Sequence, residues 1–126
     1  MFDALDISAS GLVAQRTRMD TIAQNLANIN TPRYRRRFAL LASGRAGEAG
    51  KPGVQVRRIG LDASALRKVY DPSHPQHDAD GFVHMPNVDM AVEMVNAIEA
   101  SRAYEANVTA MEVTKSMINA TLRLLA

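Results

Sequence analysis

Residues 22–37 read IAQNLANINTPRYRRR, and a seven-residue repeat of the N-terminal segment ends within them. Asn28 and Asn30 accept turn conformations, and Pro32 disfavours a helical residue before it. A helix that enters this stretch is therefore predicted to end near residues 28–31. Arginines follow at positions 33, 35, 36 and 37. The stretch fits two hypotheses: the end of a structural helix, or a basic hook for nucleic-acid phosphates.

A seven-residue repeat precedes the turn. One series of the repeat is Leu5, Leu12, Met19 and Leu26, and a second series, three positions further on, is Ser8, Gln15, Ile22 and Ile29. Such a repeat predicts a helix with a narrow stripe of side chains, here called a seam, that packs against a partner helix. Its length of about 20 to 25 residues corresponds to roughly 30 to 38 Å.

The C-terminal third carries a longer repeat. One series is Ala97, Tyr104, Met111, Ile118 and Leu125, and the interleaved series is Met94, Ser101, Val108, Lys115 and Leu122. No Pro or Gly interrupts residues 87–126, so one helix of up to about 38 residues is predicted, with Asn87 as its N-cap. Polar residues weaken both seams, and a marginal helix gains most of its stability from packing. The two helices are therefore predicted to pair as an antiparallel coiled coil.

The middle of the chain has a different pattern. Short segments rich in β-branched and aromatic residues predict two or three antiparallel strands, at 34–42, 54–59 and 66–70. Four glycines in residues 44–53 predict a hairpin loop, and the Pro- and Asp-rich residues 70–82 predict extended structure rather than a strand.

The predicted fold class follows: mainly α with a small β region, and two long terminal helices. The predicted division has three parts: an N-terminal assembly helix and turn (1–32), a β-rich and extended middle (33–86), and a C-terminal assembly helix (87–126).

Charge is distributed unevenly. Residues 33–68 hold ten Arg or Lys against two acids, a net charge of +8, whereas residues 71–112 hold eight acids against one Arg, a net charge of −7. Such a chain can neutralise itself or a neighbouring copy of itself.

Catalytic and cofactor chemistry has no support in the residues. The chain has no Cys, which excludes disulfides and thiolate metal sites. No complete phosphate loop or nucleophile elbow is present. Four residues could be considered as metal ligands: His74, His77, Asp78 and Asp80. The nearby Pro72 and Pro75 prevent the helix that the spacing of the two histidines would suit, and no further ligand is evident. We therefore predict that these four residues form turns. We therefore predict no enzyme, no cofactor, no metal and no small-molecule substrate.

Nucleic acid is the alternative partner to be weighed. A small basic binding module would use Arg33, Arg35, Arg36 and Arg37 to contact phosphates. No aromatic platform or recognition motif accompanies these arginines, which favours a structural role and no nucleic-acid partner. The N-terminus has acids where a secretory signal needs lysines, and no segment approaches the roughly 20 apolar residues of a membrane span. No cleaved signal and no transmembrane segment are expected.

Three segments together carry a family resemblance. SASGLVAQRTRMDTIAQNLANINTPRY (8–34) resembles the N-terminal signature of bacterial flagellar axial proteins. VYDPSHPQHDADGFVHMPNVDM (69–90) and MVNAIEASRAYEANVTAMEVTKSMINATLRLL (94–125) narrow the resemblance to proximal rod proteins of the FlgC type. Three motifs in the right order and at the right ends of the chain make the resemblance specific.

The resemblance implies a structural subunit of the basal-body rod, which transmits torque across the periplasm. It implies export by the flagellar type III apparatus and assembly with copies of itself, with proximal and distal rod proteins and with the export-gate adaptor. The shared turn motif would comprise Asn25, Asn28, Thr31, Pro32 and Tyr34. Arg33 departs from the family, which usually has Gly there; if that position needs a positive φ, Arg33 is strained.

The two seams predict the assembly interface. Its residues are Leu5, Leu12, Met19, Ile22, Leu26, Ile29, Met94, Ala97, Tyr104, Val108, Met111, Ile118, Leu122 and Leu125.

Overall fold

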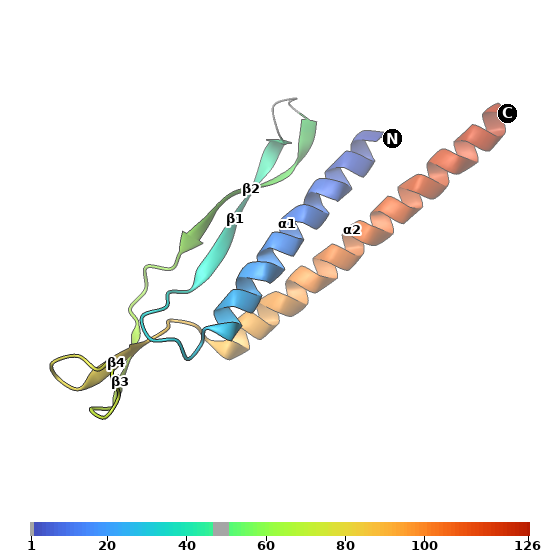
Figure 1. Ribbon diagram of the computed structural model, residues 1–126. Helices are drawn as coiled ribbons and strands as arrows, with labels where there is room; N and C mark the ends of the chain where they lie inside the picture. The colour runs from blue at the N-terminus through green and yellow to red at the C-terminus, as the bar shows by residue number, and fades with distance from the viewer. Residues whose placement is uncertain (1, 47–50) are drawn as a thin grey trace.

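Two long antiparallel helices and two β-hairpins make up the computed structural model, which describes residues 2–46 and 51–126 (Figure 1). Both termini lie at one end of the helix pair, and the smaller hairpin lies at the other. The elements are α1 (Phe2–Ala27), β1 (Arg37–Ala46), β2 (Lys51–Leu61), β3 (Arg67–Tyr70), β4 (Phe82–Met85) and α2 (Met90–Leu125). The predicted class, mainly α with a small β region and paired terminal helices, is confirmed.

Helix α1 lies between α2 and the β1–β2 hairpin and contacts both. Apart from Ile22, its buried residues are small or polar: Gly11, Ala14, Thr21 and Asn25. At Gly11 the helices approach so closely that a Cβ atom there would lie 2.7 Å from Nδ2 of Asn107. On the hairpin side, the Ser10 hydroxyl accepts a hydrogen bond from the backbone N–H of Val54 (3.0 Å). The heptad repeat predicted α2 as a partner of α1, but it did not indicate that the β1–β2 hairpin also packs against α1.

The end of α1 was predicted more accurately than the start of α2. Helix α1 ends at Ala27, next to the predicted range. Helix α2 has Asp89 as its N-cap, with Oδ1 accepting hydrogen bonds from the N–H groups of Ala91 (2.9 Å) and Val92 (3.4 Å). The predicted cap, Asn87, was wrong. Its Oδ1 instead accepts the backbone N–H of Arg36 (2.8 Å), so it stabilises the junction with β1.

The β1–β2 hairpin is longer than predicted. Its antiparallel register runs from Arg37 opposite Leu61 to Ala46 opposite Lys51, with an irregularity between Leu40 and Leu41. The strands therefore extend into both ends of the glycine-rich segment that was predicted as a loop. The centre of that segment, residues 47–50, lies outside the described residues.

A second hairpin corrects the prediction for residues 70–82. Strand β3 pairs antiparallel with β4, from Arg67 opposite Met85 to Tyr70 opposite Phe82. The Tyr70 and Phe82 rings meet edge to face, 5.3 Å between centroids. The segment between the strands is a series of turns that closes this hairpin, not the extended structure that was predicted. The described residues of the middle region therefore form two separate two-stranded sheets.

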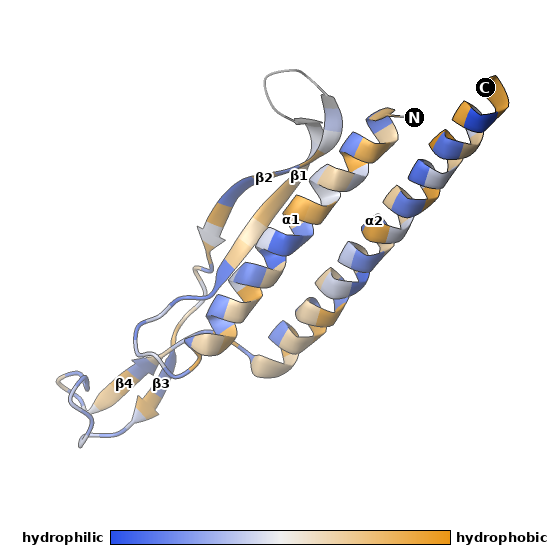
Figure 2. Ribbon diagram, turned by 45° about the vertical axis from the view of Figure 1, so that its right-hand side comes forward, coloured by the Kyte–Doolittle hydropathy of each residue, from blue (hydrophilic) through white to orange (hydrophobic). Residues whose placement is uncertain are grey.

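The hydrophobic core is thin. In the part of the chain that the structure describes, the buried apolar side chains are Ala14, Ile22, Val83 and Ala100. Much of the apolar surface of α2 is exposed, and Figure 2 shows hydrophobic residues at its free C-terminal end. Because burial of apolar area is the main stabilising term in folding, this chain gains little of it alone.

Candidate functional site

A buried polar junction ties the end of α1 to the starts of β1 and α2. We define the Asn25 junction as Asn25, Tyr34, Arg36, Arg37 and Glu93. Asn25 is fully buried, and its amide makes all four hydrogen bonds available to it. Nδ2 donates to the carbonyl of Arg37 (2.8 Å) and to Oε2 of Glu93 (3.2 Å). Oδ1 accepts from the N–H of Arg37 (2.8 Å) and from the hydroxyl of Tyr34 (3.0 Å).

Glu93 supplies the charge of this junction. It is fully buried one turn into α2, and its Oε1 accepts a short hydrogen bond from Nε of Arg36. Arg36 also lies 3.7 Å from Oδ2 of Asp62, in the segment that follows β2. A buried carboxylate is costly unless it is paired and hydrogen-bonded, and Glu93 is both. The basic middle and acidic flank of the sequence therefore meet inside the fold at this pair.

Tyr34 and Arg37 complete the junction. Burial raises the pKa of the Tyr34 hydroxyl, an effect that Arg37 opposes. The guanidinium of Arg37 lies 5.9 Å from the centroid of the Tyr34 ring, within cation–π range. The shared turn motif thus has a structural purpose here, because Tyr34 and Asn25 bond to each other across the turn.

Arg33 occupies the strained turn position that its departure from the family pattern suggested. Its φ is 64°, in the left-handed region. The strain is tolerated because the backbone N–H of Arg33 donates to the carbonyl of His84 (2.7 Å), which joins the turn to β4. Nearby, Asn28 donates to the Gln24 carbonyl (2.8 Å) and accepts from the Thr31 hydroxyl (3.1 Å).

Replacing Arg33 by glycine is expected to stabilise the fold by about 1 kcal/mol, because a residue with a Cβ atom loses roughly 1–2 kcal/mol in this conformation. For a chain of this size, that corresponds to a rise in Tm of about 3–5 °C in a circular dichroism melt. Arg33→Ala keeps the Cβ atom and removes the charge, so it should give no comparable rise. An equal gain from both variants would contradict the backbone explanation.

The arginines after the turn do not form one continuous cationic surface. Arg36 points inward to Glu93. Arg35 donates to the backbone carbonyls of Asp62 (3.3 Å) and Ser64 (3.0 Å). Only Arg33 and Arg37 of the four are exposed. Two of the side chains that a phosphate-binding hook would need are thus engaged in holding the fold.

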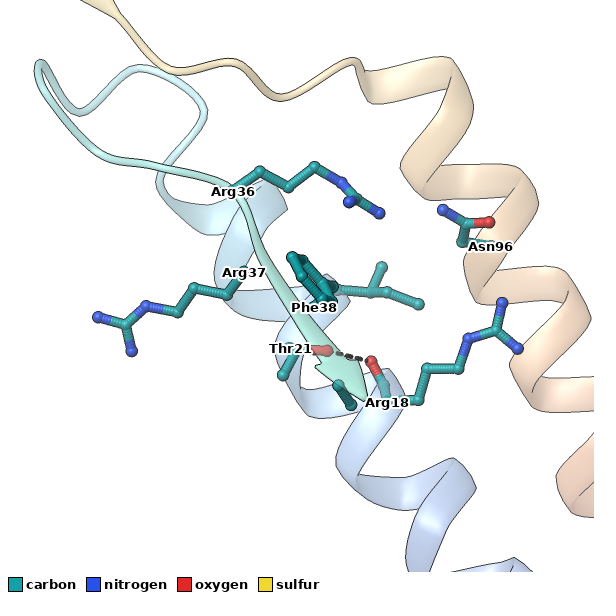
Figure 3. Close-up of a pocket in the computed structure, with 8 residues that line it drawn as sticks. Arg18, Thr21, Arg36, Arg37, Phe38 and Asn96 are labelled. Carbon is teal, nitrogen blue, oxygen red and sulfur yellow. Dashed lines mark hydrogen bonds between the residues drawn. The ribbon is translucent and has the colours of Figure 1, made fainter. Parts of the chain in front are cut away.

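A cavity of about 230 Å³ opens where α1, β1 and α2 meet (Figure 3). Arg18, Arg36 and Asn96 surround it, while the Arg37 side chain points away. Both guanidiniums near the cavity already have partners, because Arg18 pairs with Glu99 (3.3 Å) and Arg36 with Glu93. The cavity is a packing gap at the junction of three elements and offers no acid–base pair for chemistry.

The His- and Asp-rich segment makes turns, as predicted. Oδ1 of Asp78 accepts hydrogen bonds from the N–H groups of Asp80 and Phe82, both 2.9 Å. The Phe82 bond is the main reason that the pKa of Asp78 lies below its usual range. His74 accepts the N–H of Gln76 at Nδ1 (3.0 Å). Within the described residues, no group of three or more His, Cys, Asp or Glu side chains could hold a metal ion.

The structure divides the predicted assembly residues into two sets. Most are half-buried or buried: Leu5, Leu12, Met19, Ile22, Leu26, Ile29, Ala97, Tyr104, Val108, Met111 and Ile118. Three, Met94, Leu122 and Leu125, are exposed and open to another molecule. Their role in assembly stays a prediction. Sequence reasoning missed the junction residues Arg36 and Glu93, because their pairing joins positions 57 residues apart.

No helix within the described residues is long and apolar enough to span a bilayer. Two family models match the chain: "Flagella basal body rod protein" over residues 5–35, and "Flagellar basal body rod FlgEFG protein C-terminal" over residues 79–124. They cover most of both helices and, of the Asn25 junction, Asn25, Tyr34 and Glu93.

Full-length relatives also match. The flagellar basal-body rod protein FlgC of Bacillus subtilis is 42% identical, and the match covers 93% of this chain and 93% of its own. The FlgC protein of Borreliella burgdorferi is 37% identical and covers 99% of this chain and 97% of its own. The FlgC protein of Escherichia coli O6:H1 is 38% identical, over 98% of this chain and 97% of its own.

Proposed function

The chain belongs to the FlgC family of flagellar basal-body rod proteins, and we propose that it is a structural subunit of the proximal rod. Its work is mechanical: it polymerises with other rod proteins and with copies of itself, and the assembled rod transmits torque across the periplasm. The observation that carries this proposal is the exposed apolar surface of α2 above a thin core. A chain with so little buried apolar surface completes its packing against neighbours.

The division of labour follows from the three parts of the chain. Residues 1–32 and 87–126 supply the assembly helices, and residues 33–86 form the β-rich body. The Asn25 junction sets the angle between the helix pair and this body, because it bonds α1, β1 and α2 to one another. Rigid attachment of this kind suits a subunit that carries load.

Export and location follow from the same proposal. The subunit leaves the cytoplasm through the flagellar type III apparatus. It assembles next to the export-gate adaptor and below the distal rod proteins. Its seams are weak enough for a chain that is exported unfolded and gains order on assembly.

A bacterium lacking this chain is expected to be non-motile, and its basal bodies to lack a rod. Plasmid-borne wild-type chain should restore both, and the protein should be found in purified basal bodies. Electron micrographs of basal bodies, together with swimming in soft agar, measure this outcome. Normal swimming and intact rods in the deletion strain would overturn the proposal.

A further inference from the structure

A second pocket lies between the turn after α1 and the end of β2. Its volume is about 270 Å³, and its lining residues are Arg33, Tyr34, Arg35, Arg37 and Leu61. We call it the turn pocket. The Arg37 side chain, which points away from the cavity of Figure 3, is part of this lining. Of the three arginines, Arg35 already donates to two backbone carbonyls of the segment after β2.

The other two guanidinium groups of the turn pocket have no counter-ion. Arg33 and Arg37 are exposed, and no carboxylate among the described residues forms an ion pair with either of them. The carboxylates of Asp62 and Glu93 both pair with Arg36. Two cations therefore line the turn pocket without a carboxylate partner in the described part of the chain.

The fold does not need either of these guanidinium groups. Arg33 has a φ of 64°, and a glycine there would make the same backbone hydrogen bond to the His84 carbonyl without strain. Arg37 joins the Asn25 junction through its backbone N–H and carbonyl, so its side chain is not required for those bonds. Strained backbone positions are concentrated at binding and catalytic sites. The strain at Arg33 therefore points to a use for its side chain outside the fold.

Tyr34 restricts the position of the Arg37 side chain before any ligand arrives. The Arg37 guanidinium lies 5.9 Å from the centroid of the Tyr34 ring. The Tyr34 hydroxyl is in turn held by Oδ1 of Asn25 (3.0 Å), which is fully buried. A side chain that is already positioned loses less conformational freedom when it binds a ligand. The turn pocket is thus anchored to the rigid Asn25 junction.

The lining of the turn pocket indicates the chemistry of its ligand. The planar fork of an arginine matches the two oxygens of a carboxylate or a phosphate. Leu61 lies beside the two cations and is 59% exposed. A phosphate ion would leave this leucine in water, whereas an acidic side chain with an apolar neighbour would cover it. Since Arg37 already lies over the Tyr34 ring, that side of the ring is not open for a nucleotide base to stack on.

We propose that the turn pocket binds an acidic peptide segment of a neighbouring rod chain. Arg33 and Arg37 hold the carboxylate of the segment, and Leu61 contacts the apolar residue beside that carboxylate. The inference rests on the proposed function, because that function supplies rod chains as neighbours. The contact belongs to the turn and to β2, so it is separate from the packing of the two terminal helices.

Titration of the purified full-length chain with a short model peptide tests this proposal. The peptide is blocked at both ends and has one glutamate between two leucines. The Nε–H signals of Arg33 and Arg37 are followed by nuclear magnetic resonance. We expect both signals to shift to saturation with a Kd of about 1 mM at low salt, and binding to weaken as salt is added. The same peptide with glutamine in place of glutamate should not bind.

Four variants separate binding from folding. Arg33→Gly should weaken peptide binding about tenfold, although it is expected to raise the melting temperature. Arg37→Ala should weaken binding by a similar factor, and Leu61→Ala by a smaller one. Arg57→Ala is the matched control: it removes the same charge from an exposed residue of β2 outside the turn pocket and should leave the affinity unchanged.

Two results would overturn the proposal. One is the absence of shifts at Arg33 and Arg37 with the glutamate peptide at about 20 mM, well above the expected Kd. The other is inorganic phosphate binding as tightly as the peptide while Leu61→Ala leaves peptide binding unchanged, which would make the pocket a general anion site. Neither result bears on whether a strain lacking the chain builds a rod, so the proposed function would still stand.

Discussion

Replacing Asn25 by aspartate is expected to destabilise the chain by about 3–5 kcal/mol, a large fraction of the roughly 5–15 kcal/mol by which a typical domain is stable. The substitution changes one NH₂ group to an oxygen and leaves the shape almost unchanged. That oxygen would face the carbonyl of Arg37 and the carboxylate of Glu93, the two acceptors that Nδ2 now serves. A buried contact between two negative charges would then replace the hydrogen bond from Asn25 to Glu93, and both side chains would lose a hydrogen-bond partner. Urea unfolding followed by far-ultraviolet circular dichroism measures the change.

Asn28→Asp is the matched control for this prediction. Asn28 lies in the same turn, but its hydrogen bond to the Gln24 carbonyl is exposed to solvent, so a cost below about 1 kcal/mol is expected. A second test combines Asn25→Asp with Glu93→Gln, which places an amide donor opposite the new carboxylate. The double variant should cost less than the sum of the single ones by about 1–2 kcal/mol. Additive costs would show that residues 25 and 93 do not act through their mutual contact.

The helices and their pairing could be predicted because their signals are local and repeated. A seven-residue period and an Asn-Thr-Pro stop are present in consecutive residues, and α1 and α2 follow them closely. The strain at Arg33 was also foreseeable, since its conformation depends on one turn. Strand β4 was missed because it has only four residues and follows a Pro- and Asp-rich segment. Its pairing with β3 is a tertiary choice that composition does not reveal.

The junction was the least predictable feature, for a physical reason. Glu93 near the start of a helix has an adequate local explanation, as a carboxylate favoured by the helix dipole. Its actual role depends on Arg36 and Asn25, which are distant in sequence. Asn87 was likewise assigned a local role, as the helix cap. Its side chain instead accepts a hydrogen bond from the backbone N–H of Arg36, which is distant in sequence. Long-range partners decide what a polar residue does when several short-range roles are open to it.

Deleting residues 121–126 is expected to abolish swimming while changing the stability of the isolated chain by no more than about 0.5 kcal/mol. The residues removed are all exposed, and Figure 1 shows that the C-terminal end of α2 extends beyond the N-terminal end of α1, so the deletion should leave the packing of α1 intact. The lost apolar surface, chiefly Leu122, Leu124 and Leu125, then matters only to a neighbouring subunit. The truncated chain should still be exported. Soft-agar swimming, an export assay and circular dichroism melts of the truncated protein measure these three outcomes.

A milder pair of variants separates apolar contact from helix length. Changing Leu122 and Leu125 to serine keeps the helix but removes the seam, and should abolish swimming as the deletion does. Changing Ala120 and Ala126 to serine alters exposed small residues of the same segment and should leave swimming intact. If the leucine variant swims normally, the C-terminal end of α2 does not act in assembly through its apolar side chains. If its melting temperature falls by more than a few degrees, the leucines stabilise the subunit itself, and the loss of swimming would no longer indicate an interface.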